Sequence, residues 1–148
     1  MAKNLRFIFF TFLLTILSIS VNAQCKSFAN KICKLELIPY LHDGNYNAAI
    51  LTEGEDAELY KTFYSGQQYR IAICGSDNLP PVEFKVLDLE RNILFDNNTT
   101  NFKRSWDFTL ESSQQLIIFV KVQSADVEGD DVELISGCVA IMFGIKDI

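Results

Sequence analysis

Histidine is almost absent from this chain of 148 residues, with His42 as its single example. A catalytic dyad or a zinc site built on imidazole would have to use that residue. Its neighbours Asp43, Gly44 and Asn45 are typical of a turn, which explains His42 without catalysis. The spacings GxSxG, HExxH and the P-loop are also missing. We assign no catalytic residue and favour a protein without enzymatic activity, with a hydrolase that uses acidic loop residues as the alternative.

Clusters of positive charge are missing as well. The 13 lysines and arginines are outnumbered by 19 aspartates and glutamates, which gives a formal net charge of −6. An acidic domain repels the phosphate backbone of nucleic acids and the surface of anionic lipid bilayers. The composition therefore argues against nucleic acid and membrane surfaces as partners.

Long hydrophobic runs are limited to one, near the start of the chain. Lys3 and Arg6 precede a mostly apolar segment over residues 7–17, and the sequence Val21-Asn22-Ala23 fits the pattern read by signal peptidase. The run is shorter than the roughly 20 residues of a transmembrane helix. We predict a signal peptide over residues 1–23, export to the periplasm or the extracellular space, and no membrane span.

Cleavage after Ala23 would leave residues 24–148 as a single domain, long enough to bury roughly two-thirds of its unfolded surface. Loss of Lys3 and Arg6 would change the formal net charge from −6 to −8, because the segment contains no acidic residue. A lipid anchor on Cys25 is the alternative. It is disfavoured because Gln24 stands where a lipoprotein signal carries glycine or alanine.

Cysteine is present four times, as Cys25, Cys33, Cys74 and Cys138, and all four lie in the predicted mature part. An even number of cysteines in an exported chain indicates disulfides rather than free thiols. A zinc site would need closely spaced cysteine pairs and usually histidine, and the chain offers neither. We therefore predict that all four cysteines form disulfides.

One helix is expected, at the start of the mature chain. Phe28, Ile32 and Leu35 recur at spacings of four and three, which predicts a helix over residues 25–37. Pro39 would end it.

The predicted helix bears on the disulfide connectivity. In a continuous helix Cys25 and Cys33 would lie about 12 Å apart along the axis, too far for a disulfide. Each would then pair with one of Cys74 and Cys138. The pairing of Cys25 with Cys33, and of Cys74 with Cys138, stays open as the alternative if the segment is irregular.

The rest of the chain reads as short β-strands separated by turns. Residues 64–96 predict three consecutive strands, and residues 115–122 are apolar on both faces, which indicates a strand inside a sheet. About eight strands are expected, over residues 46–51, 57–63, 69–74, 82–86, 93–95, 105–110, 115–122 and 137–145. We predict an all-β fold, an antiparallel β-sandwich of jelly-roll or Greek-key type with one N-terminal helix.

Alternation along these strands also predicts the core and the loops. The core is expected to include Phe84, Val86, Trp106, Phe108, Ile118 and Val120. The polar, acidic residues 124–133 are expected to form the most mobile loop, because they have little to bury.

Four segments, SGQQYRIAIC, VEFKVLDLERNILFD, WDFTLESSQQLIIFVKV and SGCVAIMFG, carry a resemblance that spans the mature chain. They resemble small exported proteins of an uncharacterised family from Gram-negative bacteria. At the level of pattern, their order is also similar to the pre-peptidase C-terminal domain, a jelly-roll module of secreted enzymes. The resemblance implies a fold and an export address but no activity.

Acidic and amide residues gather in three loops, at residues 43–45, 96–98 and 126–133. Calcium binds six to eight oxygen ligands, so such loops can hold it where they converge. None matches the EF-hand spacing, and turns select the same residues. We predict no cofactor, and a structural calcium ion is the alternative.

Tyr60 is the candidate ligand contact, because it lies on the otherwise polar face of its strand with Glu58 and Thr62. We predict an exported, non-catalytic module that binds a protein or glycan at the bacterial cell envelope and is able to exist as a monomer. A structural subunit of an envelope assembly is a further alternative, in which the apolar residues 139–143 extend a partner's sheet from an edge.

Overall fold

The computed structural model describes residues 20–124 and 133–147 of the chain. Residues 1–19, most of the predicted loop at 124–133, and Ile148 lie outside the described part. The elements in chain order are α2 (Ser20–Lys31), η2 (Cys33–Leu37), β1 (Leu41–His42), β2 (Asn47–Thr52), β3 (Asp56–Phe63), β4 (Gln67–Gly75), β5 (Val82–Leu87), β6 (Ile93–Asp96), η3 (Asn97–Thr100), β7 (Ser105–Thr109), β8 (Gln114–Val122) and β9 (Ser136–Asp147).

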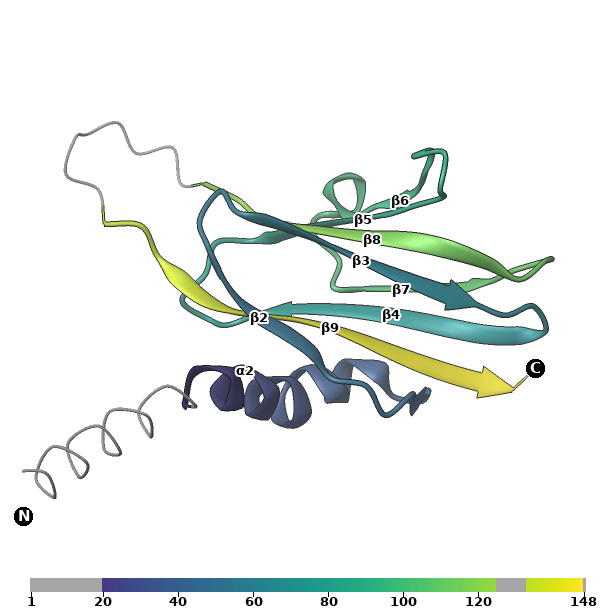
Figure 1. The fold of residues 1–148 in the computed structure, drawn as a ribbon, viewed down its shortest axis with the longest axis horizontal. Coiled ribbons are helices and arrows are strands. Elements are labelled where there is room, and N and C mark those ends of the chain that lie inside the picture. Colours follow the sequence, from purple (N-terminus) through teal and green to yellow (C-terminus); the bar gives the residue numbers. More distant parts are fainter. Residues whose placement is uncertain (1–19, 125–132, 148) are drawn as a thin grey trace, which may run out of the picture.

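Two antiparallel sheets are stacked face to face, and one helix lies beneath them (Figure 1). The first sheet has the order β1-β9-β4-β7, with β2 also paired to β9, and the second has the order β3-β8-β5-β6. The predicted all-β antiparallel sandwich with a single N-terminal helix is thereby confirmed. A short strand not predicted from the sequence, β1, pairs with the far end of β9.

The core lies between the two sheets. Phe84, Val86, Ile118 and Val120 are fully buried there, as predicted. Trp106 and Phe108 pack against this core but are only partly buried, because β7 is the last strand of its sheet. These two aromatics stack on each other, with ring centroids 4.5 Å apart, and continue the core to the edge of the sandwich.

The interior position of β8 agrees with its apolar sequence. It lies between β3 and β5, with Leu116, Ile118, Val120 and Val122 in the core. The last strand, β9, is also interior, because β4 pairs along one side and β1 and β2 along the other. It therefore has no free edge over residues 139–143, and the idea that this strand extends a partner's sheet is wrong.

The N-terminal segment differs from its prediction. The α-helix ends at Lys31, and a 3₁₀-helix follows from Cys33 to Leu37. The predicted apolar face was also misplaced, since Ile32 and Leu35 are exposed. The buried residues are instead Cys25, Ala29, Cys33 and Leu37. Small and disulfide-bonded side chains allow this segment to lie close to the sheet. The spacing of apolar residues alone did not show which face of the segment would pack against the sheet.

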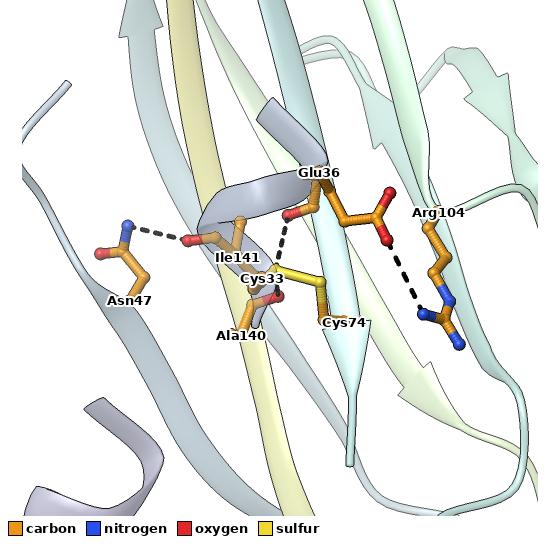
Figure 2. Close-up of a disulfide and its surroundings, with 8 residues drawn as sticks. Cys33, Glu36, Asn47, Cys74, Arg104, Ala140 and Ile141 are labelled. Atoms are coloured by element: carbon orange, nitrogen blue, oxygen red, sulfur yellow. Dashed lines mark hydrogen bonds and ion pairs between the residues drawn. A yellow bond between two sulfur atoms is a disulfide. The ribbon is translucent and has the colours of Figure 1, made fainter. Parts of the chain in front are cut away.

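Disulfides attach this segment to two neighbouring strands. Cys25 is joined to Cys138 of β9 and Cys33 to Cys74 of β4, with Cα atoms 5.2 and 5.6 Å apart. Each N-terminal cysteine thus pairs with a strand cysteine, although the helix that motivated this pairing is not continuous. Figure 2 shows the second crosslink, beside the ion pair of Glu36 with Arg104.

Candidate functional site

The two outer faces of the sandwich are built differently. The helical layer of α2 and η2 covers the outer face of the sheet that contains β4 and β9 (Figure 1). Ala72, Cys74, Ala140 and Met142 are buried beneath it. No comparable helical layer covers the outer face of the other sheet among the described residues, although η3 contacts β5 there and its Asn98 is hydrogen-bonded to the Glu83 side chain. We call this second surface, formed by the outward side chains of β3, β8 and β5 with the β5–β6 turn, the open face.

Apolar side chains line the middle of the open face. Tyr60 of β3, Ile117 of β8 and Leu87 of β5 are neighbours across the strands. Tyr60 is half exposed, whereas Ile117 is only 2% exposed. The side chains of its cross-strand neighbours surround Ile117, and the β5–β6 turn reaches across β8 beside it through Arg91. The open face therefore has a dry centre beneath a layer of amphipathic side chains.

An ion pair crosses this centre. Arg91, in the turn between β5 and β6, donates hydrogen bonds to both carboxylate oxygens of Glu58 on β3, at 2.9 and 3.1 Å. Since β8 lies between β3 and β5, this contact bridges over the central strand. The hydrogen bonds from Arg91 hold the pKa of Glu58 below its usual value. The Tyr60 hydroxyl donates to the same carboxylate, at 3.3 Å.

The turn that presents Arg91 has a defined conformation. Arg91 adopts a φ of +65°, a left-handed conformation that non-glycine residues rarely occupy. The side chain of Asp88 accepts hydrogen bonds from the backbone and side-chain amides of Asn92, both at 2.7 Å, and the Asp88 carbonyl accepts one from the Arg91 amide. The hairpin also exposes Leu89, Ile93 and Leu94. Charge and apolar surface thus occur together at this end of the open face.

A second charged cluster flanks the centre on the other side. Lys85 of β5 lies 2.6 Å from Glu83 and 3.7 Å from Asp96. The hydrogen bond to Glu83 is the main cause of the raised pKa of Lys85. The open face consequently combines apolar side chains with two ion-pair clusters, and protein-binding surfaces commonly combine an apolar core with polar surroundings.

A groove opens beside Tyr60, between the two sheets. It runs along the side of the sandwich where β2 is an edge strand of one sheet and β3 is an edge strand of the other. We call it the edge groove. Its volume is about 310 Å³, and it is lined by Tyr46, Asn47, Ala48, Ala49, Leu51, Ala57, Leu59, Val120, Val139 and Ile141. A smaller hollow of about 110 Å³ continues from it along Leu59 to Tyr60, Lys61 and Phe143. The edge groove thus reaches the core at its floor and the open face at one end.

An ion pair closes the edge groove at that end. Lys61 of β3 lies 2.7 Å from Asp43 in the turn between β1 and β2, and its ammonium group lies 4.5 Å from the centre of the Phe143 ring. Burial raises the pKa of Asp43, but hydrogen bonds from Lys61 and Asn45 outweigh this effect, so that the pKa is lowered overall. At the other end, the turn from β2 to β3 joins the two walls.

The residues singled out from the sequence are distributed over different parts of the molecule. The four cysteines hold the helical layer, and Tyr60 lies on the open face. His42 contacts the Asn45 carbonyl through Nε2 at 2.9 Å, within the turn that the sequence predicted. Among the described residues, no group of three or more His, Cys, Asp or Glu side chains is placed to hold a metal ion. No helix in the described part is long and apolar enough to cross a membrane.

Two features of this surface were missed by sequence reasoning. The partners Glu58 and Arg91 are 33 residues apart in the chain, and no local pattern links them. The polar neighbours of Tyr60 on β3 were the only feature of the sequence that indicated a solvent-facing surface here. The edge groove was missed because it depends on which strands end each sheet.

Comparison with known proteins identifies the fold. No family model and no curated protein sequence matches the chain. Among solved structures, the chain is similar to the crystal structure of Aeromonas hydrophila PliG, a periplasmic lysozyme inhibitor of g-type lysozyme. The TM-score is 0.51 at 15% sequence identity, over 73% of this chain and 89% of that one. At this identity the likeness shows a shared fold.

Proposed function

We propose that this protein is an exported, non-catalytic β-sandwich module that binds a protein partner in the cell envelope through its open face. The observation that carries this proposal is the asymmetry of the two outer faces. One is sealed by a disulfide-linked helical layer, and the other presents Tyr60, the Arg91–Glu58 pair and exposed apolar residues to solvent. Tyrosine and arginine are the residues that most often dominate the binding energy of protein interfaces.

A lysozyme is the partner class to test first. The similar structure is that of a periplasmic inhibitor of a g-type lysozyme, which supports a binding role for a sandwich of this kind. The acidic composition is compatible with a positively charged partner, because complementary charge raises the association rate.

Export is part of the proposal. Mature protein starting at Gln24 is expected, and mass spectrometry of protein from the native host would check it. The Cys25 sulfur is bonded to Cys138, so it is not available for the thioether of a lipid anchor. A diacylglyceryl mass on Cys25 would contradict both the cleavage site and this disulfide.

The test of the proposed function is an inhibition and binding assay. Purified oxidised protein is titrated against lysozymes of the g, c and i types, with cell-wall lysis and calorimetry as readouts. Tyr60→Ala and Arg91→Ala should each weaken binding by about tenfold or more. Arg104→Ala is the matched control, because Arg104 is as exposed as Arg91 and also pairs with a glutamate, but lies beside the helical layer (60% against 58% exposed side chains). Equal losses of binding affinity in all three variants would reject the open face as the binding surface. A lack of binding to every lysozyme would reject lysozymes as the partner class.

A further inference from the structure

β3 has a free edge beside the edge groove. It pairs with β8 on one side and with no other strand in the described part of the chain. The Val122 amide donates to the Glu55 carbonyl at 3.0 Å, and the register pairs Ala57 with Val120. In an antiparallel ladder alternate residues point their backbone groups to the same neighbour. The odd-numbered residues of β3 therefore bond to β8, and the amides and carbonyls of Glu58, Tyr60 and Thr62 point away from it.

The side chains beside this edge form two rows. Ala57 and Leu59 face the edge groove, whereas Glu58 and Tyr60 face the open side of the sheet. A strand added at the edge of β3 would place its own side chains alternately in the same two layers. One row would enter the edge groove, where Ala49 and Ala57 leave room, and the other would lie beside Glu58 and Tyr60.

The charges at this edge favour a cationic strand. Glu55 and Asp56 are exposed along the β2–β3 turn and at the start of β3, and Glu58, which is paired with Arg91, follows them. The one lysine of β3, Lys61, is already paired with Asp43. A second copy of this chain is disfavoured as the occupant, because each copy has a net charge of −6. Charge complementarity therefore favours a segment with positive side chains on one face and small apolar side chains on the other.

We propose that the free edge of β3 and the edge groove together bind an extended segment of a cationic protein partner, which pairs with β3 and inserts alternate apolar side chains into the groove. This proposal rests on the proposed function, because it specifies how a protein partner of the open face would be held. Main-chain hydrogen bonds would provide general affinity, and the groove would select side chains that alternate in polarity.

A synthetic peptide tests the proposal independently of any natural partner. The probe is an acetylated and amidated heptapeptide of alternating arginine and valine, added to the oxidised protein and followed by calorimetry. We expect saturable binding, and at least about tenfold weaker binding when glutamate replaces arginine. In a strand paired with β3, only alternate peptide amides point toward β3. N-methylation of that set should therefore abolish binding, and N-methylation of the other set should leave binding nearly unchanged. Equal binding by both methylated peptides, or no binding by the parent peptide at about 1 mM, would overturn the proposal.

Amide hydrogen exchange locates the pairing on β3. The amides of Glu58 and Tyr60 should exchange quickly in the free protein and slowly with the peptide bound. The amides of Leu59 and Lys61, which face β8, serve as internal controls and should be protected in both states. Protection that appears elsewhere and not at Glu58 and Tyr60 would overturn the proposal.

A groove-filling variant separates this proposal from the proposed function. Ala49 is exposed and lines the edge groove, so Ala49→Phe should fill it and weaken peptide binding by about tenfold. Thr109→Phe, at an exposed position on the opposite edge strand of the same sheet, is the control and should bind the peptide normally. Unchanged peptide binding by Ala49→Phe would overturn the proposed role of the edge groove, even if a lysozyme binds to the protein. Peptide binding that Ala49→Phe removes would support it even if no lysozyme binds.

Discussion

The covered face and the open face belong to sheets of similar size but carry opposite side-chain chemistry. Beneath the helical layer the sheet presents small residues such as Ala72, Ala140 and Gly144, and the added Cβ of an alanine at position 144 would lie 2.6 Å from Tyr40 Cβ. The open face presents longer side chains, such as Tyr60 and Glu58, around the buried Ile117. Small residues permit a second layer to dock closely, whereas long charged side chains keep a face hydrated and free for a partner.

The covered face also depends on covalent bonds in a way that the open face does not. The interface cluster beneath α2 consists mainly of alanine and cysteine, which bury little apolar area each. The two disulfides compensate for this small area by limiting the conformations of the unfolded chain. The comparison indicates that crosslinks hold the helical layer in place, whereas the ion pairs of the open face are exposed and contribute little to stability.

The largest expected effect is the loss of a crosslink from the covered face. The double variant Cys25→Ala/Cys138→Ala opens a loop of sequence separation 113 and should lower the free energy of unfolding by about 4–5 kcal/mol in the chain-entropy model. Cys33→Ala/Cys74→Ala, with a separation of 41, should cost slightly less, about 4 kcal/mol. Urea unfolding measures both. A loss below about 1 kcal/mol in either would contradict the role given to the crosslinks.

Peptide mapping of unreduced protein should find these two pairs, and a fragment that joins Cys25 to Cys33 would refute them.

The next effect tests the difference in packing. Ala72 is fully buried between the sheet and the helical layer, so Ala72→Leu should lower stability by about 1–3 kcal/mol through overpacking. Tyr60→Leu, on the open face, should change it by less than about 0.5 kcal/mol. Thermal unfolding under matched conditions gives both values. Similar losses in the two variants would mean that the open face is packed against something in solution.

Two arginines permit a matched comparison of the same residue type. Arg70 donates to both carboxylate oxygens of Asp107, at 2.6 and 2.7 Å, and to the Ile38 carbonyl at 2.7 Å, which ties the end of the helical layer to β4 and β7. Lysine cannot reproduce this planar set of contacts, so Arg70→Lys should cost about 1–3 kcal/mol. Arg91→Lys should leave the urea midpoint unchanged, because its ion pair is exposed to solvent. A larger loss of stability in Arg91→Lys than in Arg70→Lys would contradict a structural role for Arg70 and a binding role for Arg91.

The smallest expected effect is a pH dependence at the covered side. The hydrogen bonds from Arg70 lower the pKa of Asp107 below its unfolded value of about 3.9. A group with a depressed folded pKa contributes stability above its unfolded pKa, and this contribution is lost as the pH falls through the folded pKa. Asp107→Asn should therefore be less stable than the wild type at neutral pH, and the difference should shrink below about pH 4. Urea unfolding at a series of pH values checks this, and a difference that grows in acid would contradict the sign.

Most of the fold was predictable from local patterns. Alternation placed Phe84 and Val86 in the core, and the doubly apolar run of β8 placed that strand inside its sheet. The partial exposure of Trp106 and Phe108 was not predictable, because a side chain on a strand at the end of a sheet is covered on one side only. The docked face of the helix was also missed, since crosslinks rather than apolar periodicity determine it.

The candidate site was predictable only as far as Tyr60. Its polar neighbours on β3 marked a solvent-facing surface, but Arg91 reaches that surface from a turn two strands away. The edge groove depends on β2 and β3 both ending their sheets on the same side of the sandwich. Such features follow from strand order, which turn and strand patterns do not specify.

The nesting of the two crosslinks has a consequence for how the protein is made. The Cys33–Cys74 bond lies wholly within the loop that Cys25–Cys138 encloses. If the chain is exported from its N-terminus, Cys25 is the first cysteine to meet an oxidising compartment, and its partner is the last. Pairing in order of arrival would join Cys25 to Cys33 and would have to be reversed by thiol–disulfide exchange. Correct assembly of the covered face therefore waits for the end of translocation, and its yield should depend on a disulfide isomerase in the host.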